Sequence, residues 1–198
     1  MKRTIRITAL LLAIFAVFAL TACTPDKPDV PKGTDAPGPA DPTEANSSFA
    51  GKPFDENFDM AIVFDGKTYP IHCSAHDLIA VLGDDYDYNE TISCTREGYE
   101  KTYEYDGLRI DTLPDGDGDI VGLFVITGSR FSTPRNITVG STREELVAAY
   151  GENYYDDDYY LIFTKSNDPS NISEMRIQVV LENDVVTEIN VYAPDYSN

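Results

Sequence analysis

The run from Asp115 to Asp119 has residue types and a spacing that suit binding of Ca²⁺. Its three aspartates alternate with two glycines, so several carboxylate oxygens can surround one hard cation. An EF-hand loop starting here would need glycine at its sixth position and glutamate at its twelfth, where the chain has Ile120 and Ile126. The same residues also suit a solvated turn between two strands. The sequence therefore leaves two readings: a calcium site formed by Asp115, Asp117 and Asp119, or a plain connection.

The chain has only two histidines, and they lie four residues apart. His72 and His76 flank Cys73 and precede Asp77, so these four residues include the ligand types of a zinc site. The zinc interpretation is weakened because a predicted helix begins between the histidines and Cys73 has a second cysteine available as a partner. No nucleophile elbow, H-E-x-x-H sequence or phosphate-binding loop is present. We expect no enzyme activity, and no cofactor other than the calcium ion considered above.

The first 22 residues have the pattern of an export signal. A basic head precedes an uninterrupted apolar run from Ala9 to Leu20, which is short for a membrane span. The run ends in Leu-Thr-Ala-Cys, and this closely resembles the lipobox of bacterial lipoproteins. The resemblance implies that Cys23 is lipidated and becomes the first residue of the mature chain; an ordinary signal peptide or a membrane helix is the alternative. We predict an extracytoplasmic protein that touches a bacterial membrane only through this lipid.

Composition divides the mature chain into a tether and a domain. Residues 23–52 are rich in proline and polar residues and predict an extended linker, whereas residues 53–198 can bury a core. The formal net charge of the whole chain is −19. Such a surface repels nucleic acid and anionic lipid. The acidity serves either solubility alone or the binding of a cation or a basic partner.

Lipidation of Cys23 would leave two cysteines, Cys73 and Cys94, outside the cytoplasm. Cys73 precedes the first predicted helix, and Cys94 lies in a long loop, residues 84–98, that follows it. A disulfide between them would close a loop of about 20 residues and add on the order of 3 kcal/mol. We predict this disulfide; two buried thiols, or one ligand of a metal site, are the alternatives.

Two short helices are predicted from their ends. Ser141 or Thr142 can cap the first free amides of a helix, and a glutamate follows three residues later, which is the capping-box spacing. Gly151 can end this helix in a left-handed conformation. A fainter copy of the same pattern runs from Ser74 to Gly83.

Hairpin signals and apolar alternation predict the strands. They fall at 60–64, 67–71, 101–105, 108–113, 120–127, 159–165, 174–181 and 185–192, with a loop at 114–119. Each helix is thus followed by a three-stranded antiparallel meander. We predict an α+β fold of two tandem repeats, about 60–128 and 134–193, each a helix packed on a three- to four-stranded antiparallel meander.

A family resemblance agrees with this fold. The run Ile137-x-Val139-Gly140-x-Thr142-x-x-Glu145-Leu146, ending in Tyr150-Gly151, resembles the opening motif of the SmpA/OmlA lipoproteins. Two such units in tandem resemble the β-lactamase-inhibitory protein family, whose fold is two helix-plus-antiparallel-sheet repeats. The resemblance covers about residues 60–192. In that family each repeat carries a disulfide, which Cys73 and Cys94 match in the first repeat, while the second repeat has no cysteine pair.

Four tyrosines are the predicted binding residues. Tyr86 and Tyr88 follow the first predicted helix, and Tyr154 and Tyr155 follow the second. Tyrosine is enriched at binding surfaces, and related repeats would bring the two pairs to one acidic, aromatic face. Sheet packing is the alternative use of these rings. We predict a non-catalytic protein-binding module of the cell envelope, similar to an inhibitor or an assembly factor. A Ca²⁺-dependent or small-ligand sensor is the alternative.

Overall fold

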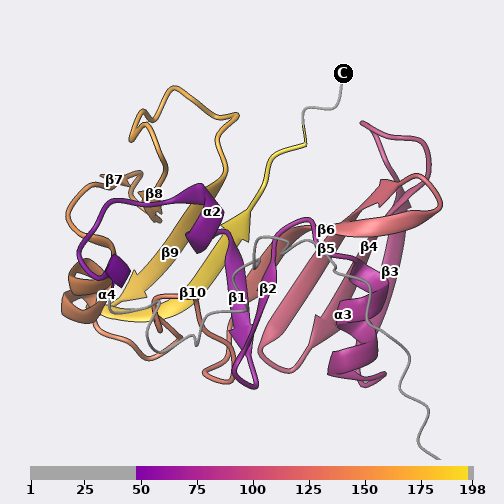
Figure 1. Cartoon of the computed structure of the whole chain (residues 1–198), viewed down its shortest axis with the longest axis horizontal. Coiled ribbons are helices and arrows are strands. Elements are labelled where there is room, and N and C mark those ends of the chain that lie inside the picture. The colour runs from indigo at the N-terminus through magenta and orange to yellow at the C-terminus, as the bar shows by residue number, and fades with distance from the viewer. Residues whose placement is uncertain (1–47, 196–198) are drawn as a thin grey trace, which may run out of the picture. The chain divides into compact units, whose positions relative to one another are not determined.

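The computed structural model describes residues 48–195, so the predicted signal peptide, Cys23 and residues 23–47 of the predicted linker lie outside it. An eight-stranded antiparallel sheet dominates these residues, in the order β3-β4-β5-β6-β10-β9-β8-β7 (Figure 1). Its strands are β3 (Asp87–Ile92), β4 (Tyr99–Tyr105), β5 (Leu108–Asp115), β6 (Gly118–Ile126), β7 (Tyr155–Asp156), β8 (Leu161–Phe163), β9 (Arg176–Glu182) and β10 (Val185–Tyr192). A separate hairpin consists of β1 (Ala61–Phe64) and β2 (Lys67–Pro70).

The helices are short, and the predicted ends of α3 and α4 are confirmed, whereas α2 was not predicted. They are α2 (Glu56–Asp59), α3 (Ala75–Leu82) and α4 (Arg143–Tyr150). The side chain of Ser74 accepts a hydrogen bond from the third amide of α3, and Thr142 forms a capping box with Glu145 at α4. Gly83 and Gly151 follow the two helices with φ angles of 91° and 77°, which glycine adopts without steric cost.

The predicted fold class is wrong. The described chain is mostly antiparallel sheet with few helical residues, and it does not consist of two repeats that each pack a helix on a separate meander. Strands β6 and β10 pair directly, with Ile126 opposite Ile189 and Leu123 opposite Tyr192. This pairing joins residues more than 60 positions apart, so the hairpin and helix signals that gave the prediction, all of them local, carry no information about it.

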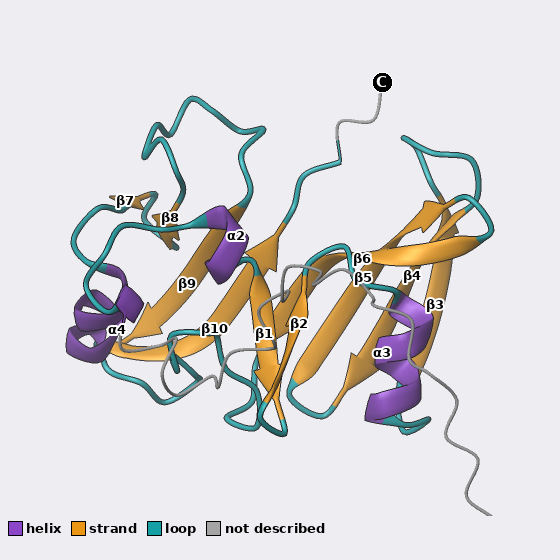
Figure 2. Ribbon diagram, viewed as in Figure 1, coloured by secondary structure: helices purple, strands orange, loops and turns teal. Residues whose placement is uncertain are grey.

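The helices and the hairpin pack on one face of the large sheet. Ile110, Phe124 and Val191 lie side by side on β5, β6 and β10 and are fully buried. They belong to one apolar core that also contains Leu78 of α3 and Leu146 of α4. Figure 2 shows α3 and the β1–β2 hairpin in front of the sheet. We call this the covered face, and the opposite one, toward which alternate side chains of the same strands point, the open face.

Candidate functional site

A depression of about 320 Å³ lies in the middle of the open face, and we call it the central hollow. Its lining residues are Arg109, Leu123, Val125, Tyr160, Gln178, Glu188, Asn190 and Tyr192. The register explains why they meet. Arg109, Val125, Asn190 and Gln178 form one row of cross-strand neighbours over β5, β6, β10 and β9, and such neighbours point to the same face. Only Tyr160 comes from outside these four strands.

One polar atom at the bottom of the central hollow has no partner in the described structure. Asn190 is only 7% exposed, and its Nδ2 donates to Glu188 Oε1 at 3.0 Å, while its Oδ1 is buried and unpaired. A buried acceptor without a donor costs free energy. The Oδ1 of Asn190 is therefore able to accept a hydrogen bond from a group that enters the hollow.

The rim of the central hollow is aromatic and carries both charges. The guanidinium of Arg176 lies 5.3 Å from the ring centre of Tyr192, and Arg109 donates to Asp111 at 3.0 Å. The lining has no histidine or cysteine, and Glu188 is its one carboxylate. This set of side chains suits recognition by contact and hydrogen bonding better than acid–base or nucleophilic chemistry.

The four predicted binding tyrosines do not come together. Tyr88 belongs to β3 and Tyr155 to β7, which are opposite edges of the eight-stranded sheet. Their side chains also point to opposite faces of the sheet. Tyr88 is the cross-strand partner of Tyr103, on the covered face, whereas Tyr155 is the partner of Ile162, which lies beside Gln178 on the open face.

Tyr86 and Tyr154 are both partly buried by other rings. Tyr86 packs edge-on against Tyr103 and Tyr105, with ring centres 5.1 and 5.3 Å apart. Tyr154 lies 5.5 Å from Phe163. A single face built from all four predicted tyrosines is therefore excluded by the sheet topology. The central hollow was missed because its residues come from four strands whose pairing the sequence does not reveal.

The aspartate run forms a tight turn. Asp115 ends β5 and Asp119 belongs to β6, and Pro114 pairs with Asp119 across the hairpin. The carboxylate of Asp119 accepts from Lys101 Nζ at 2.7 Å, and Asp115 lies 3.5 Å from Arg96. Within residues 48–195 no group of three His, Cys, Asp or Glu side chains is arranged to hold a metal ion. Calcium binding at this turn stays a prediction, and these ion pairs do not favour it.

The predicted disulfide is absent from this structure, because Cys73 and Cys94 are both free thiols. Cys73 follows β2, and its carbonyl accepts from the amide of Val121, whereas Cys94 lies in the β3–β4 turn. Burial raises the pKa of the Cys73 thiol to about 11, and Cys94 is exposed.

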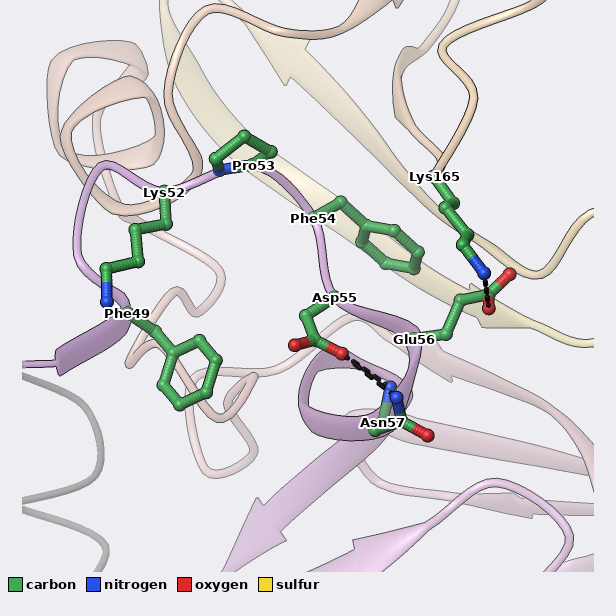
Figure 3. Close-up of a pocket in the computed structure, with 8 residues that line it drawn as sticks. All are labelled: Phe49, Lys52, Pro53, Phe54, Asp55, Glu56, Asn57 and Lys165. Atoms are coloured by element: carbon green, nitrogen blue, oxygen red, sulfur yellow. Dashed lines mark hydrogen bonds and ion pairs between the residues drawn. The ribbon is translucent and has the colours of Figure 1, made fainter.

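A second depression lies at the N-terminal segment of the described chain (Figure 3). It is lined by Phe49, Lys52, Pro53, Phe54, Asp55, Glu56, Asn57 and Lys165. Its polar side chains contact each other: Lys165 lies 3.4 Å from Glu56, and the side chain of Asp55 accepts from the backbone and side chain of Asn57. This depression is therefore a less suitable binding site than the central hollow.

Behind this segment lies a fully buried ion pair between Arg135 and Asp59. Arg135 donates from Nε and Nη2 to the two carboxylate oxygens of Asp59, both at 2.7 Å. Its remaining N–H groups donate to carbonyl oxygens of Phe49, Lys52, Pro53 and Ala149. Burial raises the pKa of Asp59, and the hydrogen bonds from Arg135 oppose that rise.

A partly exposed ion pair holds the other end of the described chain. Arg96, in the β3–β4 turn, donates from Nε and Nη2 to the carboxylate of Asp195 at 2.9 and 3.0 Å. The hydroxyl of Thr95 donates to the same carboxylate, and Arg96 also donates to the carbonyl of Pro114. The hydrogen bond to Asp195 raises the pKa of Arg96.

Comparisons with protein-family models, with curated proteins and with solved structures found no match for this chain. The resemblance to the SmpA/OmlA and β-lactamase-inhibitory protein families therefore stays a prediction from the sequence. Between residues 48 and 195, no helix has the length and apolar character needed to cross a membrane.

Proposed function

We propose that this chain is an extracytoplasmic lipoprotein that binds a protein partner of the cell envelope without catalysing a reaction. A lipid on Cys23 would hold it at a bacterial membrane, and residues 53–198 would carry the binding surface. The signal-like N-terminus and the lipobox-like sequence before Cys23 support the anchor. The composition of the central hollow supports binding.

The observation that carries this proposal is the central hollow on the open face. Tyrosine and arginine are the residues that most often dominate the energy of protein interfaces, and Tyr160, Tyr192 and Arg109 surround this hollow. A partner that covers them would also be able to donate a hydrogen bond to the unpaired Oδ1 of Asn190. No observation on the described residues favours the calcium-sensor alternative.

The test is an affinity capture from the native envelope with the lipidated chain, comparing wild type with a Tyr192→Ala/Arg109→Ala variant. Loss of two central contact residues is expected to weaken partner capture about tenfold or more. Val81→Ala is the control, because Val81 is 51% exposed and lies on α3, which packs on the covered face.

Both variants are first compared with wild type by circular dichroism, so that a folding defect is not mistaken for lost binding. Equal capture by wild type and the Tyr192→Ala/Arg109→Ala variant would contradict the proposal. Capture that depends on added Ca²⁺ and is unchanged in that variant would favour the sensor alternative instead.

A further inference from the structure

The two edges of the large sheet differ in length. Strand β7 has two residues, whereas β3 has six, and all six residues of β3 are exposed. Among the strands of residues 48–195, β3 pairs with β4 alone. Soluble proteins usually shorten, cover or interrupt an edge strand, because its free backbone groups can pair with another chain. β3 is therefore the long unprotected edge of this sheet.

The hydrogen-bond pattern identifies which backbone groups of β3 are free. The amide of Ser93 donates to the carbonyl of Gly98 at 3.0 Å in the turn that joins β3 to β4. Hydrogen-bonded pairs recur at every second residue of an antiparallel ladder, so Thr91, Asn89 and Asp87 bond to β4. The amides and carbonyls of the residues between them, Tyr88, Glu90 and Ile92, then point away from the sheet.

The side chains at this edge leave apolar surface in water. Tyr88 and Tyr99 are each 49% exposed, and Ile92 is 71% exposed. Ile92 pairs with Tyr99 across the strands, and Tyr88 lies on the same face. A strand added beside β3 would place its side chains next to Tyr88 and Ile92 and cover part of this surface.

The charge at this edge is negative. Asp84, Asp85, Asp87 and Glu90 lie on β3 or just before it, and none of them forms an ion pair within the described residues. The nearby cations form ion pairs with other carboxylates: Lys101 pairs with Asp119, and Arg96 pairs with Asp195 and Asp115. Residues 84–92 themselves contain no Lys or Arg. Two copies of β3 side by side would bring these acids together, which is unfavourable.

We propose that β3 binds an extended, basic segment of a partner protein, which joins the sheet as an additional antiparallel strand. The free backbone groups of Tyr88, Glu90 and Ile92 supply the hydrogen bonds, and the four acids attract Lys or Arg side chains of the segment. This site goes beyond the proposed function, because it lies at an edge of the sheet and the central hollow lies on the open face.

The test uses a fluorescent, end-blocked peptide of alternating Lys and Val as the probe, with binding to the full chain followed by fluorescence anisotropy. Glu90→Pro removes one outward amide and leaves the bonds to β4 in place. We expect it to weaken binding at least tenfold. Glu90→Thr is the matched control, because it removes the same charge and keeps the amide, so its loss is expected to be smaller.

Two further controls separate strand addition from other modes of binding. A peptide N-methylated at every residue keeps its side-chain charges and has no backbone N–H to donate along either edge, so it is expected not to bind. This control decides the question even where Glu90→Pro disturbs folding. Tyr192→Ala in the central hollow is expected to leave peptide binding unchanged, so failure here and failure of the proposed function are distinguishable.

Three results would overturn this proposal. The N-methylated peptide could bind as well as the parent peptide, which would show attraction between charges without strand pairing. A folded Glu90→Pro variant could bind the peptide with wild-type affinity. The wild-type chain could sediment as a dimer that Glu90→Pro dissociates, which would make the occupant of β3 a second copy of this chain.

Discussion

Two arginines hold the two ends of the described chain against the rest of the domain, and their side chains differ in solvent exposure. Arg135 holds the N-terminal segment, and both its side chain and that of Asp59 are 0% exposed. Arg96 holds Asp195 near the C-terminal end with a similar pair of hydrogen bonds, and its side chain is 22% exposed. The chemistry of the two pairs is the same. Their surroundings determine how costly it is to break each of them.

Breaking the buried pair is expected to have the largest effect on stability. Arg135→Met leaves the buried carboxylate of Asp59 with a hydrogen bond from the amide of Asp55 but without its guanidinium partner, and it removes one donor from four backbone carbonyl groups. We expect the free energy of unfolding to fall by about 3–5 kcal/mol, measured by urea denaturation. Arg130→Met is the control: this exposed arginine lies over the ring of Phe64, and its loss is expected to cost about 1 kcal/mol or less. Equal losses for Arg135→Met and Arg130→Met would show that burial of the Arg135–Asp59 pair does not raise the cost of breaking it.

The matching double variant sharpens this result. Asp59→Leu combined with Arg135→Met removes both charges, so neither carboxylate nor guanidinium is left buried alone. We expect the double variant to lose less stability than the sum of the two single variants, because the two groups interact directly. Additive losses would show that the ion pair itself contributes little.

Breaking the partly exposed pair is expected to have a smaller effect that depends on salt. Arg96→Gln removes both hydrogen bonds from the guanidinium to Asp195, whose side chain is 8% exposed and keeps the hydrogen bond from the hydroxyl of Thr95. We expect the free energy of unfolding to fall by about 1 kcal/mol at low salt, and by less at high sodium chloride because the charges are then screened. A loss that does not change with salt would mean that Arg96 acts through packing.

The smallest effect concerns thiol reactivity at the Arg96 end. In a Cys23→Ser chain, Cys94 is expected to react with a maleimide quickly, because it is exposed and lies two residues before Arg96. Cys73 is expected to react slowly at pH of about 8, where a thiol with a pKa of about 11 is ionised in roughly one molecule in a thousand. Its rate should rise as the pH approaches 11.

Mass spectrometry of Cys73→Ser and Cys94→Ser variants assigns each rate to one thiol, and labelling in urea gives the reference for full exposure. If neither thiol reacts until a reductant is added, the protein contains the disulfide predicted from the sequence.

The sequence was informative where the structure depends on neighbouring residues. The capping box of Thr142 and Glu145 and the glycine ends of α3 and α4 are local features, and they were predicted correctly. The two-residue turns at Asp65-Gly66 and Asp106-Gly107 were also predicted from their residue types. Asp65, Gly66 and Gly107 have the positive φ angles that such residues adopt readily.

The sequence was less informative where distant segments meet. The pairing of Ile126 with Ile189, which makes one sheet of two sets of strands, has no local signal. Strand β3 was taken for a loop because all its residues face water, so it shows no alternation of apolar and polar residues. The burial of Asn190 and Arg135 could not be predicted either, because burial of a polar residue depends on partners elsewhere in the chain.

The position of Arg135 has a mechanical consequence. A pull on the chain from the side of its N-terminus reaches Phe49, Lys52 and Pro53 before it reaches any strand, and one guanidinium binds the carbonyl groups of all three. If the proposed lipid anchor pulls on the chain, the force would reach this cluster before the sheet. The first resistance would then come from Arg135 together with the hydrogen bond from the amide of Gly51 to the carbonyl of Ala149.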